Sequence, residues 1–239
     1  RATRWGAHPP RPHRLVPGGG HWFLGMVCWH RNELEEAAKY FSQIVENRYV
    51  AQISSYRDAV AGLALIRQTQ GERAAAWQLL ESISQFDLEQ RGSEDNRTCS
   101  LRARLMLLQG DLEGAGHWAD TFTDPPLDQP LLWLEEPQVT RARILVARGT
   151  DADLRLALQI LDVLDEIADR TFNTRYKIEI LALRALALDT LGKTRSANDA
   201  LEQALDRIDP ADSATNGARA LLKPLLIEGI QPGGQMTIT

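Results

Sequence analysis

Hydrophobic and polar residues follow a helical period along this chain, and the same arrangement returns five times. Each copy is marked by a glycine or an asparagine, residue types that tolerate the left-handed backbone conformation at which helices stop. Counted from each marker, the positions 5, 8, 9 and 12 residues further on are apolar in every copy, which describes one face of a helix. The markers, spaced by 39, 39, 39 and 43 residues, are Asn32, Gly71, Gly110, Gly149 and Gly192.

Small residues recur on both sides of each marker. Two helices of a hairpin pack about 8 to 10 Å apart, so a small side chain on one helix leaves room for the other. Seven residues before the markers stand Gly25, Ala64, Ala103, Ala142 and Ala185. Five residues after them, four of the five copies have alanine, at Ala37, Ala76, Ala115 and Ala197. We expect these positions to be packing contacts between paired helices.

Each repeat is therefore predicted to be a helix A, a short turn at the marker and a helix B. The B helices are expected at 33–47, 72–86, 111–122, 153–169 and 194–208. Proline is absent from 18 to 124 and from 138 to 209, and almost nothing alternates with period two, which argues against strands. The sequence predicts an all-α fold, a right-handed superhelix (α-solenoid) of about five helical hairpins.

The ends of the chain differ in composition from the repeats. Residues 1–20 carry four arginines, four prolines and no acid, and we expect a flexible arm or a cut edge there. Residues 21–209 form the predicted repeat domain. Residues 210–239 are expected to hold a capping helix, interrupted at Pro224, and a disordered tail. The segment "TDPPLDQP", 123–130, is the predicted loop between the third and fourth repeats.

Charge and cysteine content narrow the class of protein. A formal net charge of −5 implies no basic face, so we expect no direct DNA binding by this chain. Cys28 and Cys99 lie in no CxxC motif, which favours a reducing compartment and a cytoplasmic location. No apolar run approaches the roughly 18 to 20 residues that a membrane span needs, so no membrane association is expected.

The repeat pattern resembles the tetratricopeptide repeat, whose small residues stand at similar places around the turn. That family usually has 34 residues per repeat and a proline at the end of helix B, and this sequence departs from both features. A closer resemblance is carried by "EEPQVTRARILVARG" and, further on, by "ALALDTLGK". These phrases look like the helical-repeat region of the large ATP-dependent LuxR-type transcriptional regulators, the MalT-like group, over roughly residues 21 to 209.

The resemblance implies a sensor and oligomerisation region that binds a partner or an effector. In that family a P-loop ATPase domain precedes the repeats and a helix-turn-helix follows them. Neither is visible here: there is no GxxxxGK[ST] motif, and the tail "IQPGGQMTIT" cannot hold a DNA-reading module. The alternative is a stand-alone tetratricopeptide-like protein that senses a small molecule or binds proteins without any link to transcription.

Arginines recur on the A helices at two positions. Arg102, Arg141 and Arg184 stand eight residues before a marker, and Arg104 and Arg143 stand six before. These offsets lie about 200° apart on a helix, so only one set can face a concave groove, and we favour Arg104 and Arg143. Arginines that face the groove would bind an acidic peptide or an anionic ligand. The alternative is that all five arginines form ion pairs with acids of neighbouring helices.

Other candidate chemistry is sparse. Trp22 and Trp29 lie one amphipathic period apart on the first A helix, where they are either core residues or an interface. No HExxH motif, paired CxxC motif or activated nucleophile is present, so we expect no catalysis, no metal and no cofactor. The expected ligand is a protein partner or a small effector in the concave groove, with self-association through exposed array ends as a further expectation.

Overall fold

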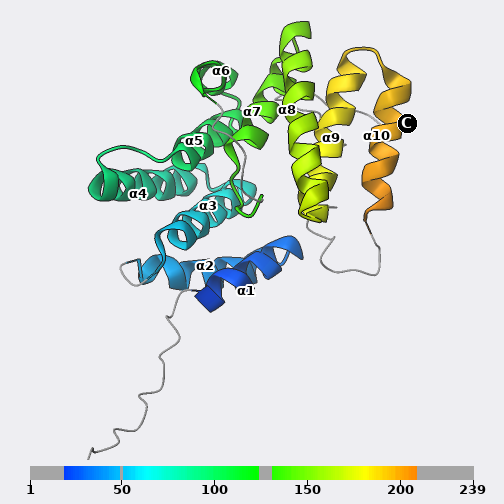
Figure 1. Ribbon diagram of the computed structural model, residues 1–239. Helices are drawn as coiled ribbons and strands as arrows, with labels where there is room; N and C mark the ends of the chain where they lie inside the picture. Colours follow the sequence, from blue (N-terminus) through cyan, green and yellow to red (C-terminus); the bar gives the residue numbers. More distant parts are fainter. Residues whose placement is uncertain (1–18, 49–50, 124–130, 209–239) are drawn as a thin grey trace, which may run out of the picture.

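The computed structural model describes residues 19–48, 51–123 and 131–208, and this part of the chain is all α-helix without a strand (Figure 1). Ten helices lie in it, in five consecutive pairs, and the all-α prediction is confirmed. The pairs are α1 (Gly19–His30) with α2 (Leu34–Glu46), α3 (Ile53–Thr69) with α4 (Arg73–Arg91), α5 (Asn96–Leu108) with α6 (Leu112–Thr121), α7 (Pro137–Arg148) with α8 (Asp151–Arg170), and α9 (Thr174–Thr190) with α10 (Thr194–Asp206).

Each hairpin turns at its predicted marker. Gly71, Gly110, Gly149 and Gly192 have φ values of 80°, 89°, 69° and 72°, and Asn32 has a φ of 61°. After Gly71 the amide of Glu72 donates to the carbonyl of Arg67 over 2.9 Å, which closes the end of α3. The left-handed conformation at the marker is what allows helix A to stop and helix B to start within three residues.

The small residues lie where helices approach each other closely. All nine are buried, at Gly25, Ala64, Ala103, Ala142, Ala185, Ala37, Ala76, Ala115 and Ala197. Gly25 shows the reason most directly, because a Cβ atom on it would lie 2.4 Å from the ring of Phe41 in α2. Phe41 is itself fully buried, so the first hairpin closes only with glycine at this position.

The first helices of the hairpins, α1, α3, α5, α7 and α9, form one continuous layer, which we name the A layer. Each of them contacts the next member of the layer. The second helices α2, α4, α6 and α8 each contact two neighbouring A helices, their own and the following one. The B helices begin and end within five residues of the predicted bounds, and α8, with 20 residues, accounts for the wider spacing before Gly192. The handedness of the superhelix stays a prediction.

The predicted ends of the repeat domain are only partly covered. Helix α1 begins at Gly19, inside the segment assigned to an arm, so the repeat domain starts two residues earlier than expected. The rest of that arm, the capping helix and tail at 210–239, and most of the 123–130 loop lie outside the described residues. Among the described helices, none is both long enough and apolar enough to cross a membrane.

Candidate functional site

An extended segment, residues 131–136, crosses the A layer before α7 begins, and we call it the strap. Its two buried leucines enter different cores: Leu134 packs among residues of α1 to α5, and Leu131 among residues of α7, α8 and α9. Glu136 caps the turn that leads into α7, because its carboxylate accepts from the amides of Leu132 and Trp133 at 3.1 Å each. The strap therefore joins the first three hairpins to the last two.

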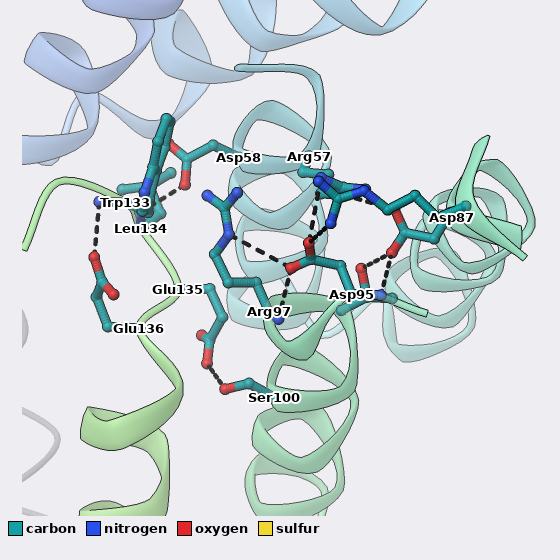
Figure 2. Close-up of polar contacts among 12 residues, drawn as sticks. Arg57, Asp58, Asp87, Asp95, Arg97, Ser100, Trp133, Leu134, Glu135 and Glu136 are labelled. Carbon is teal, nitrogen blue, oxygen red and sulfur yellow. Dashed lines mark hydrogen bonds and ion pairs between the residues drawn. The ribbon is translucent and has the colours of Figure 1, made fainter. Parts of the chain in front are cut away.

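The side chain of Asp58, on α3, binds the backbone of the strap (Figure 2). The amide of Leu134 donates to Oδ1 of Asp58 over 2.7 Å, and the indole Nε1 of Trp22 donates to Oδ2 over 2.8 Å. Burial raises the pKa of Asp58 to about 6, although both hydrogen bonds work in the opposite direction. Burial likewise raises the pKa of Glu136 to about 7.

Arg104, a predicted groove residue, is buried against the strap. Its guanidinium lies 2.8 Å from Oε2 of Glu135, whose other oxygen accepts from Ser100 and from Thr140 at 2.5 Å each. Burial lowers the pKa of Arg104, and the nearby charge of Arg143 adds to that effect. The acidic segment that Arg104 grips belongs to this chain itself.

Arg143, the second predicted groove residue, repeats this arrangement one hairpin further on. It lies in α7 and forms a buried ion pair with Glu179 of α9, the next A helix. Burial works to lower the pKa of Arg143, but Glu179 and Glu135 outweigh it and raise that pKa. Burial works to raise the pKa of Glu179, but the positive charges of Arg143, Arg175 and Arg104 together outweigh it and lower that pKa. Arg104 and Arg143, six residues before their markers, thus point along the A layer. Ligand binding by these two arginines stays a prediction.

The arginines that stand eight residues before a marker point the other way, towards the preceding hairpin: to the connection after α4 for Arg102, and to α6 and α8 for Arg141 and Arg184. Arg102 pairs with Glu94, the Nε of Arg141 donates to the carbonyl of Ala119 over 3.0 Å, and Arg184 lies 3.1 Å from Asp162. The division between the two sets follows from the 200° that separates their offsets on a helix.

The tryptophans of α1 are half-buried and pack against the first core. Trp22 is joined to the strap, since its ring centroid lies 5.6 Å from that of Trp133 and its indole N–H reaches Asp58. Trp29 has no such polar role among the described residues. Nearby, burial lowers the pKa of His30 to about 3, and the positive charge of Arg175 contributes. The end of α1 therefore lies within electrostatic range of the start of α9.

Two arginines that the repeat pattern did not single out, Arg97 and Arg175, lie on aromatic rings beside the strap. The guanidinium carbon of Arg97 is 4.4 Å from the ring centroid of Trp133, and that of Arg175 is 4.5 Å from the ring of Tyr176. In the sequence they share only their place as the second residue of an A helix. Their distances from the following marker differ from each other, so they do not recur in the repeat pattern. Neither could be found by the recurrence that revealed Arg104 and Arg143.

Other features of the described surface carry less chemistry. A cavity of about 360 Å³ lies between α2, α3 and α4, with Val45, Leu63, Arg67 and Leu79 in its wall. No group of three or more His, Cys, Asp or Glu residues that could hold a metal ion occurs in the described ranges.

Comparison with known proteins identifies the family. The family model described as the MalT-like TPR region matches residues 7–207, most of the chain. This protein is thus a helical-repeat protein of the tetratricopeptide type. The chain belongs to the MalT-like TPR region family, as the "TRAR…ARG" and "ALALDTLGK" phrases indicated. Searches of curated proteins and of solved structures gave no match.

Proposed function

We propose that this chain is a non-catalytic binding module that takes a protein partner or a small effector, as the helical-repeat region of a MalT-type transcriptional regulator. The proposal is supported by the family match over residues 7–207, together with the array of helical hairpins that the described residues form between Gly19 and Asp206. The A layer supplies a rigid scaffold, because buried ion pairs and the strap fix the position of each A helix.

The link to transcription is tested by reading the coding DNA on both sides of this segment. The proposal predicts an in-frame P-loop ATPase domain upstream and a helix-turn-helix domain downstream. Stop codons that close both ends would contradict that link, and would leave the stand-alone binding protein as the function to pursue.

The division of labour within such a regulator is tested on the chain itself. A gel-shift experiment is expected to show no sequence-specific DNA binding, because the net charge is −5 and no DNA-reading module is visible. A turnover screen is expected to find no activity. A specific shift or a reproducible turnover would each overturn the corresponding part of the proposal.

An effector role is favoured over protein binding alone by Arg97 and Arg175. Both guanidinium groups lie on aromatic rings and have buried N–H atoms without a protein partner in the described structure. A ligand that binds the folded chain raises its unfolding free energy by about 2.7 kcal/mol at a hundredfold excess over Kd, which a thermal shift detects. No shift across a broad panel of metabolites would contradict the effector role.

A further inference from the structure

Arg97 and Arg175, both half-buried, differ from the other arginines of the A layer in their ion pairing. Among the described residues, no carboxylate lies within 4 Å of Arg175, and the nearest to Arg97 is Asp95, at 3.7 Å from Nε. The Nη1 of Arg97 and the Nε of Arg175 are buried and have no hydrogen-bond acceptor among the described residues. One nitrogen each of Arg57 and Arg184 is in the same position, but those two guanidinium groups pair with Asp87 and Asp162 at 2.6 and 3.1 Å. Buried donors without acceptors are rare, and each one calls for a partner.

The two guanidinium groups belong to one continuous ledge. The guanidinium carbon of Arg97 lies over the ring of Trp133 and that of Arg175 over the ring of Tyr176, and the hydroxyl of Tyr176 donates to the carbonyl of Trp133 over 2.5 Å. Figure 2 shows Arg97 reaching from α5 towards the strap, between Asp95 and the ring of Trp133. A guanidinium group over an aromatic face keeps the nitrogen atoms at its edge for an anion. Both side chains are partly exposed, that of Arg97 by 19%.

The surroundings of the ledge favour negative charge. Arg97 and Arg175 are the second residues of α5 and α9, and the N-terminal end of a helix attracts anions. Asp95 is shared among three arginines, Arg57, Arg91 and Arg97, so its charge does not neutralise Arg97 alone. The other carboxylates on which these arginines act electrostatically already have partners. Asp58 accepts from Leu134 and Trp22, Glu136 accepts from two amides of the strap, and Glu179 pairs with Arg143.

We propose that Arg97 and Arg175 bind the carboxylate or phosphate group of a small organic anion on this ledge. The inference rests on the proposed function and names the chemistry of its effector. The anion accepts hydrogen bonds from the edges of the two stacked guanidinium groups, in the planar geometry that carboxylates and phosphates share.

The rim of the ledge indicates an apolar body for the ligand. The side-chain amide of Asn173 donates to the carbonyl of Leu131 over 2.6 Å, which brings the α8–α9 turn against the strap. The residues next to this bond in the sequence are exposed and apolar: 51% of the surface of Leu132 and 92% of that of Phe172 is accessible. Phe172 also has a φ of 54°, a conformation that bulky residues rarely adopt. An anion with a hydrocarbon portion covers surface that the protein leaves to solvent.

The test uses two probes, inorganic phosphate and octanoate, with calorimetric titration and thermal unfolding at constant ionic strength. The Arg97→Gln/Arg175→Gln double variant is compared with wild type and with Arg155→Gln, which removes an exposed arginine from an i,i+4 pair with Asp151. We expect wild type and Arg155→Gln to bind at least one probe equally, and the double variant to bind it at least tenfold more weakly. Because phosphate also stabilises proteins without binding, only differences between the proteins count.

Two outcomes would overturn the inference: equal affinity of the double variant for the probes, or no binding of either probe by wild type. Phe172→Ser tests the apolar part of the ligand alone. This variant should bind octanoate more weakly than wild type and should bind phosphate with the same affinity. If folding of the double variant is impaired, Arg175→Lys keeps the charge without the planar edge and should still lose affinity. Failure of anion binding leaves the proposed function standing when the flanking DNA encodes the two expected domains, so the two failures are distinguishable.

Discussion

Arg104 and Arg143, in the middle of α5 and α7, differ from Arg97 and Arg175, at the N-terminal ends of α5 and α9, in what their guanidinium groups contact. In the middle of the A layer each arginine is buried against a glutamate, Arg104 against Glu135 and Arg143 against Glu179. Glu135 belongs to the strap and Glu179 to α9. At the helix ends each arginine lies on an aromatic ring. The same residue type thus serves cohesion in one region and is available for recognition in the other, so recurrence in the sequence marks the structural set.

The largest expected effect comes from breaking the ion pair in the middle of the layer. Glu135→Ala leaves Arg104 buried without its carboxylate, which should lower the free energy of unfolding by about 3 to 5 kcal/mol. Urea denaturation followed by circular dichroism measures this loss. The control is Arg155→Ala, which removes an exposed pair and should cost about 0.5 kcal/mol or less. Similar losses for the two variants would refute the distinction between buried and exposed pairs.

The strap is the next point at which the comparison can be tested. Leu134→Ala removes a buried side chain from the core of the first hairpins and should cost about 2 to 5 kcal/mol. Leu132→Ala, on the same segment but half exposed, should change the free energy of unfolding by about 0.5 kcal/mol or less. If the two leucines prove equivalent in urea denaturation, the strap does not anchor the A layer.

Close packing at the first hairpin predicts a smaller loss. Gly25→Ala places a methyl group against the buried ring of Phe41, and overpacking of this kind costs about 1 to 3 kcal/mol. Gly20→Ala, in the same helix, meets nothing within 4 Å and should be neutral or slightly stabilising, because alanine favours helix over glycine. A lower melting temperature for Gly20→Ala than for Gly25→Ala would contradict the close approach of α1 and α2.

The pattern of residues predicted most of the fold, and the physical reason is that the repeat is local. The left-handed turns at Gly71 and Gly110 and the small residues at Ala64 and Ala103 depend on contacts within one hairpin and its neighbour, which a fixed period reveals. The strap was not predicted as a structural element. Its contacts reach across 76 residues, from Leu134 to Asp58, and no period encodes them.

The candidate site was predictable only in residue type. Spacing separates the arginines into two sets on opposite sides of a helix, and the sequence offers acids of neighbouring helices as their partners, but it does not say which acid meets which arginine. Which arginines remain without close carboxylates depends on the strap and on the rings of Trp133 and Tyr176, which come together only in the folded chain. The site therefore moves from the recurrent positions to Arg97 and Arg175.

The smallest expected effect is a pH dependence that originates at Asp58. Its pKa in the folded chain, about 6, lies above its ordinary value of 3.8, so its contribution to stability is complete below about pH 4 and is lost as the pH rises through 6. Asp58→Asn does not titrate. Wild type should therefore lose on the order of 2 kcal/mol relative to the variant between pH 4.5 and 7.5. Denaturation at several pH values measures this, and parallel curves for the two proteins would contradict it.

The most direct measurement compares Arg104→Gln with Arg175→Gln by urea denaturation in a buffer without phosphate or carboxylates. We predict that Arg104→Gln loses about 3 to 5 kcal/mol, because Glu135 then remains buried without its partner. Arg175→Gln should stay within about 1 kcal/mol of wild type, because it loses its contact with the ring of Tyr176 and its attraction to Glu179 and Asp58, but no ion pair within 4 Å. Equal losses for the two variants would show that Arg175 serves cohesion as Arg104 does, and would contradict the assignment of the helix ends to recognition.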